Sequence, residues 1–296
     1  MPLKLSNIIR VSLHNPPPFT YYYARSILLR QSPLADFDDT RPCVFVLSTG
    51  RSGTHTLTGL YRLAPGFLAY HEPGADLDGL AKTAYEYGTG DDASISGIFA
   101  EAFLAARHTL LQTSLYARKG YIETSHFNTF LAPYIYQALP AVRFLHITRH
   151  PRDFVNSAIR RGWYRGNIFD KNRIVPRMGS DEVNQWSTYE PYKKNIWLWA
   201  ETNRWIAQFL DTIPAENTLQ IRAEDIFAGE MEMIVQLYRL IDTPVPSTNN
   251  IEKVLNEKLD SPPQRAFTPL EKWTDAMLSD LDAIAGETAA KLGYNI

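Results

Sequence analysis

The stretch that decides the fold is residues 43–57, CVFVLSTGRSGTHTL. It opens with five apolar residues, a run that is typical of a strand buried in a parallel sheet. Small residues, among them Gly50 and Gly53, then interrupt the run, and leucines at helical spacing follow from Leu57 onward. The stretch therefore predicts a strand, a glycine turn and the start of a helix.

A turn of this kind is suited to bind a phosphate group. Glycines allow successive backbone N–H groups to point at one anion, and the helix N-terminus adds partial positive charge. A nucleoside-triphosphate loop, however, ends in Gly-Lys-Ser/Thr, whose lysine contacts the β- and γ-phosphates and whose hydroxyl binds Mg²⁺. Here Gly53-Thr54-His55 stands in that place, and Arg51 is the nearby cation. The loop therefore suits a 5′-phosphate that carries one further anionic group.

A second stretch, residues 143–157, reads RFLHITRHPRDFVNS. It predicts a strand that ends before Arg149, followed by a helix whose first turn contains Pro151. Ser157 comes eight residues after Arg149. An arginine side chain can bind a phosphate through two parallel hydrogen bonds, and a serine hydroxyl adds a third donor. The sequence thus indicates a second anion site.

Together these stretches resemble the sulfotransferases that use 3′-phosphoadenosine 5′-phosphosulfate (PAPS). Arg51 to His55 is similar to their 5′-phosphosulfate loop, which reads Lys/Arg-Ser/Thr-Gly-Thr/Ser-Thr, and Arg149 with Ser157 matches their 3′-phosphate motif. Residues 218–225, TLQIRAED, are similar to a late strand of the family, and residues 273–294, which close in Leu-Gly-Tyr, to its last helix. The chain departs from the family at His55, where many relatives have threonine. It also lacks the Arg-Lys-Gly loop of the cytosolic branch, for which Arg265 is the nearest substitute.

The resemblance implies one α/β domain with a central parallel sheet flanked by helices, the sulfotransferase form of the P-loop-containing nucleotide hydrolase fold. We expect this domain over residues 41–296, after an N-terminal extension of residues 1–40. It implies transfer of a sulfuryl group from PAPS to a hydroxyl or an amine of a small metabolite or sugar. Adenosine 3′,5′-bisphosphate (PAP) is the implied product, and no metal is implied. The implied nucleotide-binding residues are Gly50, Arg51, Ser52, Gly53, Thr54, His55, Thr56, Arg149 and Ser157.

The chemistry requires a cation at the leaving group and a base for the acceptor. Arg51 would neutralise charge on the phosphosulfate, since a guanidinium remains protonated and cannot act as an acid. Glu72, after the second predicted strand, resembles the base of the glycan-sulfating branch and comes first. His126, after the third, falls one residue from the Lys-Thr-His position of the cytosolic branch, and a histidine is nearer to neutral pKa. His71 beside Glu72 is the third candidate, and the sequence leaves the choice open.

The rest of the pattern alternates strands with helices, which predicts a parallel sheet with right-handed crossovers. The predicted strands are residues 43–47, 67–70, 120–124, 143–147 and 219–222. The predicted helices are residues 56–63, 98–118, 129–139, 152–161, 192–210, 230–242, 249–259 and 269–292. Trp197, Trp199 and Trp205 are predicted to lie in the core. Glu224 and Asp225 are interpreted as structural, with Asp225 capping the next segment.

Residues 162–191 have weak periodicity over about thirty residues, and loops of that length are usually functional lids or disordered. Their aromatic residues argue against disorder. The segment leaves the helix that carries Ser157, so we expect it to cover the nucleotide site and bind the acceptor.

Composition narrows the class of protein further. The 296 residues carry a net charge of −2, so no overall field attracts nucleic acid or a membrane surface. No run approaches the roughly 18 apolar residues of a membrane span. The single cysteine, Cys43, excludes an internal disulfide and suits a reducing compartment, so we expect a cytoplasmic protein. The sequence gives no indication of oligomeric state.

Two other functions are compatible with a phosphate-binding loop. The first is a P-loop kinase for a small substrate, which the absent loop lysine disfavours. The second is a nucleotide-binding scaffold without catalytic activity, which would keep the loop but lack a base.

Overall fold

The computed structural model describes residues 37–88, 93–257 and 272–296. Its centre is a parallel sheet of five strands in the order β2-β3-β1-β4-β5. The strands are β1 (Cys43–Leu47), β2 (Phe67–Tyr70), β3 (Gly120–Glu123), β4 (Val142–Thr148) and β5 (Thr218–Arg222). The predicted α/β architecture is confirmed, and every predicted strand is present with its ends displaced by at most one residue.

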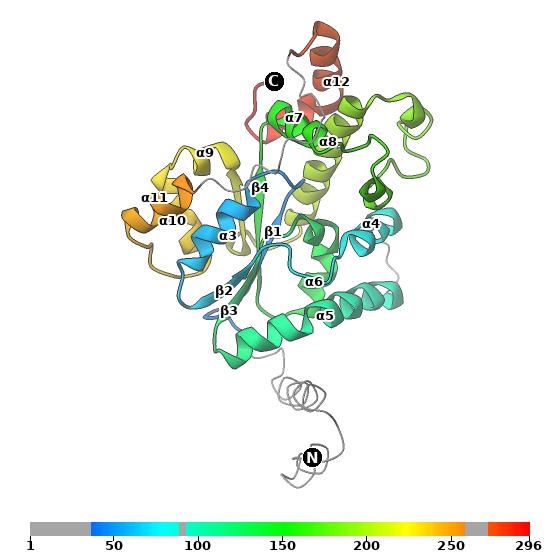
Figure 1. Cartoon of the computed structure of the whole chain (residues 1–296). Helices are drawn as coiled ribbons and strands as arrows, with labels where there is room; N and C mark the ends of the chain where they lie inside the picture. The colour runs from blue at the N-terminus through cyan, green and yellow to red at the C-terminus, as the bar shows by residue number, and fades with distance from the viewer. Residues whose placement is uncertain (1–36, 89–92, 258–271) are drawn as a thin grey trace.

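Helices cover both faces of the sheet, as Figure 1 shows. Strand β1 alternates accordingly: Phe45 and Leu47 lie in one buried core, and Val44 and Val46 lie in the other. The core around Val44 is completed by α3 (Thr54–Arg62), α9 (Ala223–Phe227), α10 (Met231–Arg239) and α11 (Thr248–Asn256). The opposite core is completed by α4 (Asp78–Tyr87), α5 (Ala93–Tyr116), α6 (Ala132–Ala138), α7 (Pro151–Arg160), α8 (Pro191–Leu210) and α12 (Asp275–Lys291).

The helices differ from the prediction most clearly in two regions, and the short helix α9 and the first turn of α5 were not predicted either. The helix expected over residues 129–139 is a 3-10 helix, η2 (His126–Leu131), followed by the short α6, in whose first turn a proline lies. A proline lacks an N–H donor, and for that reason it suits the start of a new helix better than the middle of an old one. Helix α4 was not predicted, because its buried face consists of Ala81, Ala84 and Tyr85, and small alanines give a weak apolar period.

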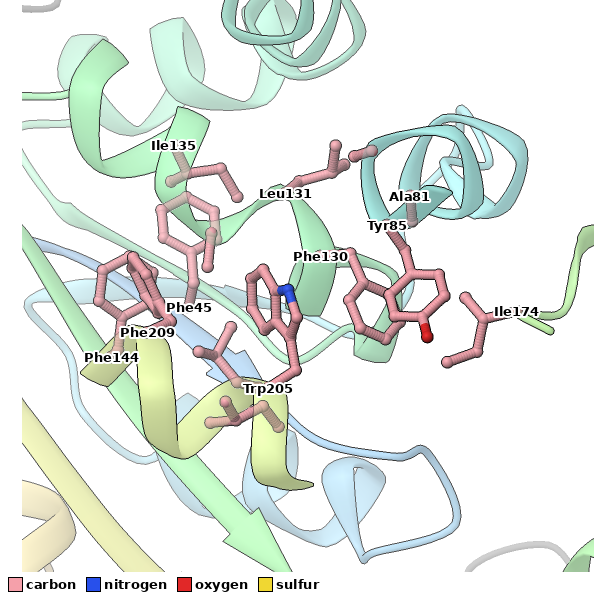
Figure 2. Close-up of a cluster of buried hydrophobic side chains, with 14 of the residues drawn as sticks. Phe45, Ala81, Tyr85, Phe130, Leu131, Ile135, Phe144, Ile174, Trp205 and Phe209 are labelled. Carbon is pink, nitrogen blue, oxygen red and sulfur yellow. The ribbon is translucent and has the colours of Figure 1, made fainter. Parts of the chain in front are cut away.

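The aromatic core fixes α8 to the sheet. Trp197, Trp199 and Trp205 are all buried, so their predicted core position is confirmed. Figure 2 shows the indole of Trp205 between Phe130 and Phe209, with ring centroids 5.2 and 5.8 Å away. Phe209 in turn contacts Phe144 of β4 at 5.1 Å. Helix α8 is therefore a rigid support beside the central strands.

The predicted N-terminal extension, residues 1–40, falls almost wholly outside the described residues, as does Arg265. Phe37, at the start of the described chain, is buried in the core that contains Phe45. None of the helices in the described part of the chain combines the length and the apolar character that a membrane span needs.

Candidate active site

The predicted site residues come from one edge of the sheet. Strand β1 lies between β3 and β4, and the chain turns to opposite sides of β1 on its way to β2 and to β4. In open α/β sheets, ligands bind at the carboxyl ends of the strands where the strand order reverses in this way. The glycine loop follows β1 at that point, Glu72 follows β2, His126 follows β3, and Arg149 follows β4.

The glycine loop is held open by left-handed backbone. Gly50, Arg51 and Gly53 have φ angles of 75°, 57° and 85°. The Ser52 hydroxyl, which is fully buried, donates to the carbonyl oxygen of Gly50 at 3.1 Å, and the Gly50 N–H donates to the Ser48 hydroxyl at 3.1 Å. The side chain of Ser52 thus stabilises the loop, while its backbone N–H remains available.

Backbone donors gather where the loop enters α3. The N–H groups of Arg51, Ser52, Gly53 and Thr54 donate to no acceptor within the described ranges of the chain. Four adjacent donors at a helix N-terminus fit the oxygen atoms of a phosphate or a sulfate. Thr54 and Thr56, on the first turn of α3, are buried, whereas His55 is exposed. The residues present therefore fit the phosphosulfate group of PAPS.

Three arginines concentrate positive charge at this loop. Arg51 donates from Nε to the Ser157 hydroxyl at 3.1 Å, and Arg149 donates from Nη1 to the backbone oxygen of Arg51 at 3.0 Å. Burial and the positive charges of Arg161 and Arg149 lower the pKa of Arg51 to about 10, although Glu72 acts in the opposite direction. Within the described ranges, none of the three arginines forms an ion pair with a carboxylate. Such a cluster is stabilised by an anionic ligand.

Arg161 is the cation that the sequence analysis missed. It is the residue that caps α7 at its C-terminal end, four positions after Ser157. Residues four apart on a helix share a face. The spacing from Ser157 to Arg161 was the available signal.

Two of the three candidate bases form a hydrogen-bonded pair. His126 Nδ1 lies 2.9 Å from Glu72 Oε1. Partial burial raises the pKa of Glu72, but the hydrogen bond from His126 and the charges of His126, His71 and Arg51 outweigh it, so the pKa is lowered. An ionised carboxylate only accepts hydrogen bonds, which places the proton on Nδ1 and leaves Nε2 as the acceptor of the ring.

This pair lies against the glycine loop. A Cβ atom built on Gly50 would be 3.2 Å from Cγ and Cδ2 of His126, so the ring occupies the space beside the loop backbone. Glu72 itself has a φ of 40°, a left-handed conformation that is uncommon for a glutamate. The structure thus brings Glu72, His126 and the glycine loop together.

His71, the third candidate base, has a different environment. Its Nδ1 lies 3.0 Å from the backbone oxygen of Thr124, and its ring centroid is 4.9 Å from that of His55. Burial lowers the pKa of His71 even though Glu72 and the Thr124 contact raise it. Its Nδ1 is therefore engaged in holding the end of β3.

The loop that carries Glu72 rests on a buried ion pair. Arg107 of α5 donates from Nε and Nη2 to the two carboxylate oxygens of Glu123 at 2.8 and 2.9 Å. The Tyr121 hydroxyl donates to the same carboxylate at 2.6 Å, and Arg107 Nη1 donates to the carbonyl oxygen of Ala75 at 2.8 Å. Both charged side chains are fully buried, and no pattern in the sequence indicates their pairing.

Glu224 and Asp225 have the structural roles expected of them, with one correction. The carboxylate of Glu224 accepts hydrogen bonds from the His150 N–H and the Tyr294 hydroxyl. Asp225 was expected to cap a segment, and this is wrong. Its carboxylate binds the side chain of Arg222, because that guanidinium lies within reach at the preceding turn.

Residues 162–191 pack on α4 and α8. Two 3-10 helices, η3 (Ile168–Asn172) and η4 (Trp186–Thr188), interrupt the segment. The Asn172 amide donates to Asp78 at 2.7 Å, and the ring of Trp186 lies 5.0 Å from that of Trp197. Ile174 reaches the aromatic core beside Tyr85 (Figure 2). The segment is ordered by these contacts, and its acceptor role stays a prediction.

Comparison with known proteins identifies the class. Residues 42–247 match the model of the sulfotransferase family, so the chain belongs to that family. The protein is a sulfotransferase, which confirms the resemblance and counts against the small-substrate kinase.

Solved structures share the fold at low sequence identity. The sulfotransferase domain from the curacin biosynthetic pathway is 18% identical, with 86% of this chain and 99% of that chain covered and a TM-score of 0.51. A sulfotransferase from Alicyclobacillus acidocaldarius is 15% identical, with 86% and 97% covered and a TM-score of 0.50. A mouse sulfotransferase complexed with PAP is 15% identical, with 87% and 88% covered and a TM-score of 0.49. No curated protein matches the sequence.

Proposed function

We propose that this enzyme transfers the sulfuryl group of PAPS to a hydroxyl or an amine of a small metabolite or sugar, without a metal ion. One observation carries the proposal. Arg51, Arg149 and Arg161, none of which forms an ion pair with a carboxylate in the described chain, lie close together at a loop with open N–H donors, and a histidine–glutamate pair adjoins that loop. Positive charge without a counter-ion suits the anionic donor, and a proton acceptor beside it suits the nucleophile.

The donor site divides between the loop and the end of β4. When bound, PAPS supplies an activated sulfuryl group and leaves as PAP. The N–H groups of the loop hold the 5′-phosphate, with Thr54, His55 and Thr56 on the adjoining turn. Arg149 and Ser157 bind the 3′-phosphate, since the Ser157 hydroxyl accepts from Arg51 and keeps its own proton to donate. Arg51 neutralises the charge that grows on the leaving oxygen.

In the acceptor site, His126 takes the proton of the nucleophile at Nε2. The hydrogen bond from Nδ1 to Glu72 selects this tautomer and stabilises the imidazolium that forms. Glu72, the first candidate base in the sequence, becomes the residue that orients His126. The alternative is direct proton transfer to Glu72, which a lowered pKa makes less effective at neutral pH.

Residues 162–191 cover the acceptor as a lid, within a sulfotransferase domain of residues 41–296 that follows an N-terminal extension of residues 1–40. We place the enzyme in the cytoplasm, where its buried Cys43 remains reduced.

Thermal unfolding with different nucleotides tests the donor site. PAP without metal should raise Tm, and ATP with Mg²⁺ should not, because a ligand that binds only the native state stabilises it by mass action. Equal stabilisation by both would remove the donor assignment. Incubation with ³⁵S-labelled PAPS and fractionated small metabolites, followed by mass spectrometry of labelled products, then tests transfer. Label found only in inorganic sulfate would contradict the proposed acceptor class.

A further inference from the structure

The end of the chain contacts the strand that carries Arg149. The Tyr294 hydroxyl donates to Glu224 Oε2 at 3.0 Å, and it lies 2.9 Å from the Thr148 hydroxyl. Because the phenol proton is used toward Glu224, the phenol oxygen is an acceptor for the Thr148 hydroxyl, whose single proton is shared between it and the carbonyl oxygen of Ile221 at 3.3 Å. Tyr294 thereby joins the last residue of β4 to helix α9. The Leu-Gly-Tyr ending noted in the sequence acquires a specific partner.

The backbone around Arg149 is held at every adjacent position. Trp199 Nε1 donates to the carbonyl oxygen of Arg149 at 2.8 Å. The N–H of His150 donates to Glu224 Oε1 at 2.8 Å, and His150 Nε2 lies 3.3 Å from the carbonyl oxygen of Asn295. One carboxylate thus receives both the phenol of Tyr294 and the backbone that follows Arg149.

The C-terminal segment is itself anchored. The Tyr294 N–H donates to the carbonyl oxygen of Ala289 at 2.9 Å, after Gly293 turns the chain with a φ of 76°. The rings of Tyr294 and Trp199 lie 6.2 Å apart, and Tyr294 is 7% exposed. Because the ring and the backbone of Tyr294 are both held in place, its hydroxyl limits the movement of Thr148 and Glu224.

We infer that Tyr294 is a positioning residue that holds the Arg149 side chain in the geometry for a 3′-phosphate. The inference deepens the proposed donor site and rests on it. Arg149 lies one residue beyond β4, where the strand ladder no longer fixes the backbone, and its Nη1 reaches the Arg51 carbonyl at 3.0 Å. Two-point binding of a phosphate by a guanidinium depends on the direction of the side chain. A small rotation of residues 148–150 would therefore weaken recognition of the 3′-phosphate and leave the 5′-phosphate loop intact.

The test is the ratio of two affinities, measured by calorimetry for PAP and for adenosine 5′-phosphate. Tyr294→Phe should reduce the preference for PAP about tenfold, as expected when two hydrogen bonds of ordinary strength are lost, with adenosine 5′-phosphate binding within about twofold of wild type. Tyr192→Phe is the matched control. It removes a phenol hydrogen bond to Asp280 of α12, at 2.6 Å, and should leave the ratio unchanged.

A double-mutant cycle separates positioning from general destabilisation. Thr148→Val should lower the same ratio, and the loss in the double variant should be smaller than the sum of the two single losses, because both substitutions remove the Tyr294–Thr148 contact while each also removes one further hydrogen bond, to Glu224 and to Ile221 respectively. An unchanged ratio in Tyr294→Phe, or equal weakening of both nucleotides together with a lower Tm, would overturn the inference. If the wild-type protein itself showed no preference for PAP, the proposed donor site would be wrong and the inference would fall with it.

Discussion

The charged side chains that follow β4 and those that follow β2 differ in whether they form ion pairs. At the end of β4, Arg149 lies with Arg51 and Arg161, and none of the three forms an ion pair with a carboxylate within the described ranges. At the end of β2, Glu72 pairs with His126, and the loop below it is supported by the ion pair of Arg107 and Glu123. Positive charge is left without an ion-pair partner where we propose that the anionic nucleotide binds, and charge is balanced within the protein where we propose that the acceptor enters. Positive charge without an ion-pair partner is therefore a better indicator of the proposed donor site than a paired charge is.

The supports of the two ends differ as well. Neutral donors, Trp199 and Tyr294, hold the residues around Arg149. A buried guanidinium, Arg107, holds the carbonyl of Ala75 after Glu72. Loss of one member of a buried ion pair is far more costly than loss of a neutral hydrogen bond. The acceptor end is therefore expected to be the more fragile of the two.

The largest effect should come from breaking the pair at the end of β2. His126→Ala should lower kcat by roughly 10²–10⁴, since general base catalysis is lost, while calorimetry should show unchanged binding of PAP. Glu72→Gln should also lower kcat, because Nδ1 loses its ionised partner.

The pH dependence of kcat identifies which member takes the proton. A histidine base gives a limb at a higher pH than a carboxylate base does, with activity lost as the pH falls below that limb. Glu72, whose pKa is lowered from 4.5, would give a limb below pH 4.5. A wild-type limb in that acid range, together with an active His126→Ala variant, would make Glu72 the base.

The buried ion pair tests the fragility of the acceptor end. Arg107→Met should lower the free energy of unfolding by about 3–5 kcal/mol, because Glu123 is left buried and unpaired. Urea denaturation measures this, and Arg107→Met combined with Glu123→Gln should recover part of the loss. The matched control is Lys291→Met, which removes an exposed pair with Glu287 and should leave stability nearly unchanged, because solvent screens an ion pair at the surface. Equal effects of the two single substitutions would contradict the comparison.

The proposed donor site is tested by removing the side chain of Arg149, which we propose binds the 3′-phosphate. Arg149→Ala should weaken PAP by about 1.5–3 kcal/mol, the usual value of a hydrogen bond to a charged group, and adenosine 5′-phosphate hardly at all. Isothermal calorimetry with both nucleotides provides the measurement. Arg160→Ala, at an exposed position of α7, is the control that should change neither affinity. Parallel losses for both nucleotides would assign Arg149 to the 5′-phosphate instead.

The smallest effect is expected for Gly50, the loop glycine beside His126. Gly50→Ala should cost about 1–2 kcal/mol of stability, because an L-residue is disfavoured at positive φ. The added methyl would also lie 3.2 Å from His126, so kcat should fall with it. Gly66→Ala, where a Cβ meets no atom within 4 Å, is the control. A Gly50→Ala variant with full stability and full kcat would show that the contact with His126 is not restrictive.

Local patterns in the sequence were sufficient for the sheet and for the donor motifs. A strand buried on both faces is a short apolar run, and a phosphate turn is a glycine cluster between a strand and a helix, so β1 and its loop are visible without any tertiary contact. The same holds for Arg149 and Ser157, whose separation is fixed by one strand end and one helix. Helix α4 was missed because its buried face is mainly alanine.

The pairing of Glu72 with His126 was decided by the tertiary structure alone. Tyr70 of β2 lies opposite Glu123 of β3, and this register brings the residues that follow the two strands together although they are 54 positions apart in the chain. The register of parallel neighbours depends on strand order and on crossover packing, which leave no periodic trace in either segment. Tyr294 reaches Thr148 across 146 positions for the same reason, so its contact with the donor strand appears only once α12 is packed in place.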